Sequence, residues 1–225
     1  MIVAGTERPF FRWDWVGSHI GEILERVLEH LVLTGIAVGV GLIISALLAG
    51  LALRYRRTYG PITWLSAGLY AIPSLALFAF LVPITGFTML SAQIGLVSYT
   101  LLILVRSIVT GIDGVDPAIR EAAVGMGYSR RRLLFEVELP LAMPVILAGI
   151  RVTAVTTVGL VTITALIGRG GLGFFILRGL GRFFWTEVIV AITLSVALAA
   201  AIDRVLVLVG RLVAPWTERR ARVGA

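Results

Sequence analysis

The sequence predicts an all-α integral membrane protein, a bundle of about five transmembrane helices with a cytoplasmic loop between the third and the fourth. Three observations lead to this prediction. Hydrophobic residues make up 58% of the 225 residues and charged residues only 15%. The mean hydropathy is +0.98. The apolar residues also form long runs, whereas soluble domains are only about 45–50% apolar and about 25% charged.

Five runs reach the roughly 20 apolar residues that a helix needs to cross the hydrocarbon core. We expect spans over about 31–53, 62–82, 92–112, 145–167 and 188–213. Pro73 interrupts the second run near mid-membrane, where non-helical backbone is tolerated if it lines a cavity or is buried in protein. Asp203 and Arg204 lie in the second half of the fifth run, where we expect local pairing or snorkelling.

We expect no signal peptide in the first thirty residues, because no basic segment precedes a short apolar core and a cleavage site there. Residues 1–26 have a different pattern. They combine aromatic side chains, among them Trp13 and Trp15, with apolar residues at helical spacing opposite glutamates. We therefore expect an interfacial segment that leads into a transmembrane domain over 27–213. His19 and His30 are isolated, which favours surface or interface positions over metal ligation.

The arginines predict the orientation in the membrane. With five spans, one side of the membrane carries eleven arginines: Arg54, Arg56, Arg57, Arg120, Arg130, Arg131, Arg132, Arg211, Arg219, Arg220 and Arg222. The other side carries six: Arg8, Arg12, Arg26, Arg169, Arg178 and Arg182. Cytoplasmic loops carry an excess of arginine and lysine. This places the loop 113–140 and the tail 214–225 in the cytoplasm and the N-terminus outside. The net charge of +7 is scattered and forms no basic stripe, so we expect no nucleic acid partner.

No pattern supports a catalytic or metal site. The chain has no cysteine and lacks H-E-x-x-H, G-x-S-x-G and paired intramembrane aspartates. The stretch GRGGLG at 168–173 fits G-x-G-x-x-G but follows a span instead of a strand, so we interpret it as a tight turn at the mouth of a pathway. A phosphate-binding G-x-x-x-x-G-K-[ST] motif is also lacking. A non-enzymatic transport protein is favoured, with a stand-alone channel or carrier as the alternative class.

The loop 113–140 is unusually polar for this chain. Asp116 followed by Pro117 predicts a helix start, Gly125 and Gly127 its end, and Ser129 the cap of a second helix before Pro140. Two short helices joined by a glycine turn suit docking on another protein. The alternative is an ordinary solvated loop.

The sequence of this loop, EAAVGMGYSRRRLLFEVELP at 121–140, resembles the EAA loop of binding-protein-dependent ABC importer permeases. That pattern is Glu-Ala-Ala, three residues, Gly, nine residues, then Ile-x-Leu-Pro, and Val137 is the only departure from it. Segments at 28–38, 72–86, 114–127, 143–151 and 166–180 are similar to the osmoprotectant branch, which imports glycine betaine, carnitine and choline. Importers of methionine and of small oxyanions have permeases of similar architecture.

The resemblance implies a coupling helix that sits in a groove on a separate ATPase. The motif positions are Glu121, Ala122, Ala123, Gly127, Leu139 and Pro140. It implies as partners a dimer of ABC ATPase subunits that bind ATP and magnesium, a second permease subunit, identical or related, and an extracytoplasmic solute-binding protein. The setting it implies is the cytoplasmic membrane of a bacterium or an archaeon.

Candidate pathway residues lie in the second and fourth spans. They are Pro73, Ser74, Thr153, Thr156, Thr157 and Thr164. The four threonines share one helical face, and such a stripe either lines a polar pathway or bonds back to its own helix carbonyls. Both interpretations stay open. Aromatic residues inside the spans show no clustering, so we expect an aromatic cage for a quaternary ammonium solute in the binding protein.

Overall fold

The computed structural model describes residues 10–216, and all their regular secondary structure is helical. Four helical stretches are long and apolar enough to cross a membrane: α2 (Ile20–Arg54), α5 (Met89–Asp113), the stretch Arg130–Ile167 that contains α8 (Leu139–Ile163), and α10 (Trp185–Val213). A fifth apolar segment consists of α3 (Tyr59–Ala71) and α4 (Ser74–Thr85), bent by 94°. The predicted bundle of about five spans is confirmed.

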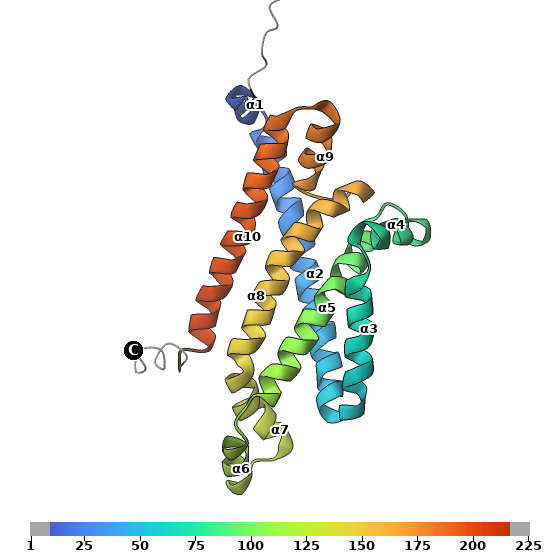
Figure 1. The fold of residues 1–225 in the computed structure, drawn as a ribbon. Coiled ribbons are helices and arrows are strands. Elements are labelled where there is room, and N and C mark those ends of the chain that lie inside the picture. Colours follow the sequence, from blue (N-terminus) through green and yellow to red (C-terminus); the bar gives the residue numbers. More distant parts are fainter. Residues whose placement is uncertain (1–9, 217–225) are drawn as a thin grey trace, which may run out of the picture.

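Helix α5 is the centre of the bundle and packs against α2, α3, α4 and α8 (Figure 1). Small residues allow the closest approaches. Gly41 of α2 lies against Thr100 of α5, and Gly149 of α8 lies against Ser107 of α5, so a Cβ at either glycine would overlap the facing hydroxyl. Without a hydrophobic driving force between helices in lipid, such close packing is a main source of their association.

Helix α2 includes the first span and part of the predicted interfacial segment. The short helix α1 (Trp13–Ser18) is followed by His19 alone, and α2 then continues for 35 residues. At about 1.5 Å per residue, α2 is much longer than the hydrocarbon core of about 30 Å, so its first turns extend beyond the core. Residues 1–9 of the predicted interfacial segment and 217–225 of the predicted tail lie outside the described residues.

The predicted interruption at Pro73 is present between α3 and α4. Ile72 has ψ 128°, the extended conformation that a following proline favours. The break frees the Ile72 carbonyl, and the hydroxyl of Tyr99 on α5 donates a hydrogen bond to it. The rings of Tyr70 and Tyr99 meet edge to face with centroids 5.9 Å apart. Helix α5 thus satisfies the backbone where the span breaks.

The predicted start of each helix in the 113–140 loop is confirmed. Helix α6 (Pro117–Gly125) begins where the Asp116 carboxylate accepts a hydrogen bond from the Ala118 amide at 2.8 Å. Gly127 has φ +83°, so the turn uses a conformation that glycine adopts freely. Ser129 caps α7 (Arg130–Leu133) by accepting from the Arg132 amide at 3.4 Å.

The predicted end of the second loop helix before Pro140 is wrong. Helix α7 leads into a π-helical turn, η2 (Leu134–Glu138), which continues into α8 without a gap. Pro140 lies in the first turn of α8, and its ring would meet the Glu136 carbonyl in a regular α-helix. The wider π-turn relieves that clash. The fourth span therefore has a helical extension that starts well before residue 145.

The glycines at 168–173 form the predicted tight turn between η3 (Thr164–Ile167) and α9 (Gly173–Arg182). Gly168 and Gly171 have φ +76° and +47°. Gly173 lies so close to the Thr162 carbonyl that a Cβ would overlap it. The turn therefore depends on glycine both for conformation and for space.

Candidate functional site

The loop 113–140 projects past the ends of α5 and α8, with α6 farthest out (Figure 1). Glu121 and Ala122 are exposed on α6, whereas Ala123 is only 2% exposed. The sequence pattern treats the two alanines alike. The structure separates them, because only Ala122 is available to a partner while Ala123 packs within the chain.

The loop also exposes large apolar side chains. They are Ile119, Val124, Met126 and Phe135. Large apolar side chains exposed on a projecting element are typical of a protein–protein interface. Sequence reasoning missed these four residues, although their placement on the two short helices could have indicated them.

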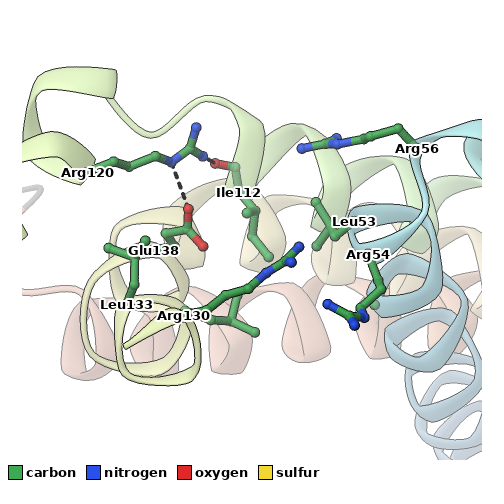
Figure 2. A pocket seen from close by; sticks show the side chains of 10 residues that line it. Leu53, Arg54, Arg56, Ile112, Arg120, Arg130, Leu133 and Glu138 are labelled. Atoms are coloured by element: carbon green, nitrogen blue, oxygen red, sulfur yellow. Dashed lines mark hydrogen bonds and ion pairs between the residues drawn. The ribbon is translucent and has the colours of Figure 1, made fainter. Parts of the chain in front are cut away.

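Arg120 connects α6 to the bundle. Its guanidinium Nε lies 2.7 Å from the carboxylate of Glu138 in η2, and its Nη2 donates a hydrogen bond to the Ile112 carbonyl at the end of α5 (Figure 2). The Arg120 and Glu138 side chains are 28% and 15% exposed. Sequence reasoning counted Arg120 only as a loop charge. One side chain therefore ties α6 to both helices that border the loop.

A second ion pair fastens the turn between α2 and α3 at the same end of the bundle. Arg56 contacts both carboxylate oxygens of Asp113, the last residue of α5, at 2.6 and 2.7 Å. Leu139, at the end of the EAA pattern, packs on the buried cluster that includes Ala49 and Val105. The motif thus starts on an exposed helix and ends in the core, with Leu139 and Pro140 half-buried.

The four threonines of the fourth apolar segment do not share an open surface. Thr153, Thr157 and Thr164 are at most 1% exposed, whereas Thr156 is exposed. The hydroxyls of Thr156, Thr157 and Thr164 donate to carbonyls three or four residues earlier, at 2.7 to 3.0 Å. For these three threonines the structure supports hydrogen bonds to the helix backbone, whereas the buried hydroxyl of Thr153 has no hydrogen-bond partner among the described residues. Of the predicted pathway residues, Pro73 and Thr156 are exposed and Ser74 is half-buried.

Asp203 of α10 pairs with Arg151 of α8, a partner that the sequence did not indicate. Its carboxylate accepts two hydrogen bonds from Arg151 of α8, at 2.8 and 3.0 Å. Asp203 therefore has the structural pairing role that we expected, but its partner lies on another helix and not nearby in the sequence. Packing of α10 against α8 brings the two charges together inside the apolar segments, where a charge without a partner is costly.

At the opposite end of the bundle, Arg178 of α9 holds three helices together. Its guanidinium lies 2.7 Å from Glu22 of α2 and 2.8 Å from Glu187 of α10, which is 2% exposed. The rings of Phe174 and Phe175 lie 4.9 and 5.0 Å from the same group. Because buried charges require partners, this network fixes α9 against α2 and α10.

His30 is fully buried, so the expectation of a surface or interface position is wrong. Its Nε2 lies 3.0 Å from the Val158 carbonyl, and its Nδ1 lies 3.4 Å from the Leu172 amide nitrogen. The carbonyl accepts and the amide donates, which corresponds to a neutral imidazole protonated on Nε2. His30 thereby joins α2, α8 and the glycine turn.

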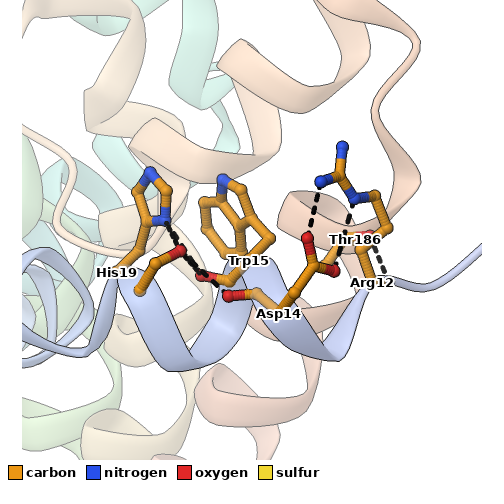
Figure 3. Close-up of polar contacts among 6 residues, drawn as sticks. Arg12, Asp14, Trp15, His19 and Thr186 are labelled. Carbon is orange, nitrogen blue, oxygen red and sulfur yellow. Dashed lines mark hydrogen bonds and ion pairs between the residues drawn. The ribbon is translucent and has the colours of Figure 1, made fainter.

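Helix α1 is fixed at the same end (Figure 3). The Arg12 amide donates to the Thr186 hydroxyl at 3.0 Å, and the Arg12 guanidinium pairs with Asp14 at 2.6 Å. That pair lowers the pKa of the Asp14 carboxyl. The rings of Trp15 and His19 stack with centroids 4.4 Å apart. These contacts hold α1 and the residue before it against α10.

The chain is similar to known membrane transport proteins in sequence and in fold. The family described as "Binding-protein-dependent transport system inner membrane component" matches residues 41–223. The chain is 34% identical to the choline transport system permease protein OpuBB of Bacillus subtilis, over 90% of this chain and 93% of that protein. It is also 34% identical to the glycine betaine/carnitine/choline transport system permease protein OpuCB of the same organism, over 87% and 90%.

Among solved structures, an inward-facing MetNI methionine ABC transporter aligns with a TM-score of 0.75 at 20% identity, covering 85% of this chain and 95% of that chain. At this identity the likeness concerns the fold alone. The bundle with its projecting loop is thus a fold that solved ABC transporters share.

Proposed function

Because the chain belongs to the family of binding-protein-dependent transport system inner membrane components, we propose that it is the permease of an osmoprotectant importer, with glycine betaine, carnitine or choline as solute. The observation that carries the solute class is the 34% identity over most of the chain to permeases named for these compounds. These solutes share a quaternary ammonium group. The two spans next to the 113–140 loop, α5 and α8, pack directly on each other and would transmit movement of the loop to the bundle.

The loop docks on a separate ABC ATPase subunit that binds ATP and magnesium. Exposed Glu121 and Ala122 and the exposed apolar side chains of the loop support this role. Gly127 sets the turn, and the Arg120–Glu138 pair makes α6 move together with η2 and α8. Closure of two ATPase subunits would then rock the packed helices between two states, so that access alternates across the membrane.

The complex contains two permease subunits, two ATPase subunits and a solute-binding protein. The loop faces the cytoplasm and the N-terminus lies outside, as the arginine distribution indicates. High-affinity selection of the solute falls to the binding protein, in line with the absence of an aromatic cluster from the spans expected from sequence.

The test is uptake of labelled glycine betaine, carnitine and choline at high osmolarity in cells with and without this subunit. Loss of uptake on deletion, restored by the native chain, supports the proposal. If deletion leaves the uptake of these solutes unchanged but abolishes methionine or oxyanion uptake, the osmoprotectant assignment is wrong, while the assignment as an importer permease stands. Transport by the chain alone, without an ATPase, would instead indicate a channel or carrier.

A further inference from the structure

A cavity of about 280 Å³ lies between the end of α2 and the 113–140 loop. Four arginines contribute to its wall: Arg54, Arg56, Arg120 and Arg130. Figure 2 shows the guanidinium groups of Arg54, Arg56 and Arg130 directed toward the same space. The cavity is therefore strongly basic, and its charges come from the turn after α2, from α6 and from α7.

The acidic side chains near this cavity leave two arginines without a counter-ion. Glu138 pairs with Arg120, and Asp113 pairs with Arg56. Among residues 10–216, no carboxylate lies within ion-pair distance of Arg54 or Arg130. Two positive charges that face one space attract an anion, and the planar guanidinium matches a phosphate with two parallel hydrogen bonds.

The other part of the wall is apolar. It consists of Leu53, Ile112, Leu133 and Leu134, with Gly50. A free inorganic anion gains nothing from such a wall, whereas an amphiphile with an anionic head places its apolar part there. The cavity thus combines the two surfaces that a phospholipid head and glycerol region require.

The position of the cavity in the bundle also suits a phospholipid. Arg54 is the last residue of α2 and Ile112 lies at the end of α5, so the cavity is level with the ends of the spans. Helix α6 lies farther out (Figure 1). Basic pockets between helices at the cytoplasmic membrane surface are typical binding sites for anionic lipid head groups.

We propose that this cavity binds the phosphate group of an anionic phospholipid, held by Arg54 and Arg130. The lipid would connect the end of α2 to the 113–140 loop through a contact outside the protein chain. The proposal rests on the orientation given under the proposed function, because anionic lipids are concentrated in the cytoplasmic leaflet. It does not depend on the solute.

The test is native mass spectrometry of the permease–ATPase complex titrated with phosphatidylglycerol. The variant Arg54→Gln/Arg130→Gln removes both phosphate-binding charges. Its matched control, Arg57→Gln/Arg131→Gln, removes the same charge from neighbouring exposed positions that do not line the cavity. At about five-fold per arginine near an anionic head group, we expect about thirty-fold weaker binding in the first variant and little change in the second.

A third variant, Arg54→Lys/Arg130→Lys, keeps the charge but loses the planar fork, so its binding should lie between that of the native chain and that of Arg54→Gln/Arg130→Gln. Such partial retention guards against a loss caused by misfolding. Equal loss in the matched control, or no loss in either double variant, would overturn the proposal. So would displacement of the lipid by an equal concentration of inorganic phosphate, or binding only in the absence of the ATPase. Uptake is measured separately, so a failure of the solute assignment leaves this test unaffected.

Discussion

Glu138 of η2 lies 2.7 Å from Arg120 of α6, so a single ion pair joins the exposed helix of the loop to the start of α8. Arg120 also binds the Ile112 carbonyl at the end of α5. Arg120 thereby connects α6 to α5 and to the start of α8, two helices that pack directly on each other.

We expect Glu138→Gln to lower ATP-driven uptake by about ten-fold, because a partly buried ion pair contributes about 1–2 kcal/mol. The measurement is solute uptake together with ATP hydrolysis in proteoliposomes. Glu136→Gln is the matched control, since Glu136 pairs with Arg132 at the exposed surface of the same turn. Hydrolysis should persist in both variants. Equal uptake in both would contradict a transmitting role for the pair.

Ala122→Arg and Ala123→Arg should fail in different ways. Ala122 is exposed, so an arginine there should block docking and remove the ATPase from the purified complex without lowering stability. Ala123 is 2% exposed, so an arginine there should destabilise the chain by about 3 kcal/mol or more. Co-purification and thermal unfolding in detergent separate the two effects. Retention of the ATPase by the Ala122→Arg variant would contradict docking at this surface.

His30→Leu should destabilise the protein by about 1–3 kcal/mol, because it leaves a buried carbonyl and a buried amide without partners. The readout is the midpoint of thermal unfolding in detergent. His30→Gln, which can still donate to the Val158 carbonyl, should recover part of the loss. His19→Leu is the control at a half-buried position. If the two leucine variants unfold alike, the buried contacts of His30 contribute little.

Gly173→Ala should destabilise the α9 turn by about 1–3 kcal/mol, because its Cβ would overlap the Thr162 carbonyl. Gly181→Ala lies in the same helix with open space around it and should be neutral or slightly stabilising. Thermal unfolding of the two variants gives the comparison. A tolerated alanine at position 173 would show that the turn can shift.

The orientation is accessible to thiol labelling, since the chain has no cysteine. Met126→Cys and Phe183→Cys place a thiol on a highly exposed residue at either end of the bundle. An impermeant reagent added to intact cells should label position 183, and position 126 only after lysis. The reverse pattern would invert the proposed orientation and with it the leaflet of the lipid site.

Several features were predictable from sequence because they depend on neighbouring residues. The apolar runs gave the number of spans, Pro73 marked the break, and Asp116 and Ser129 marked helix starts that their side chains cap. The glycine turn at 168–173 also followed from residue type, since positive φ favours glycine. Hydropathy, capping and proline act over a few residues, so one sequence suffices to locate them.

The tertiary structure decided which faces meet. The partners of His30 and Asp203 lie 128 and 52 residues away, and α6 buries Ala123 while it exposes Ala122. Helix packing also determines three other features: the burial of Thr153 and Thr157, the Arg120–Glu138 pair and the basic cavity. Each depends on how the helices rotate and cross when small residues such as Gly41 and Gly149 let them approach. Apolar residues cover nearly the whole circumference of a membrane helix, so its periodicity does not reveal which side faces a neighbour and which faces lipid.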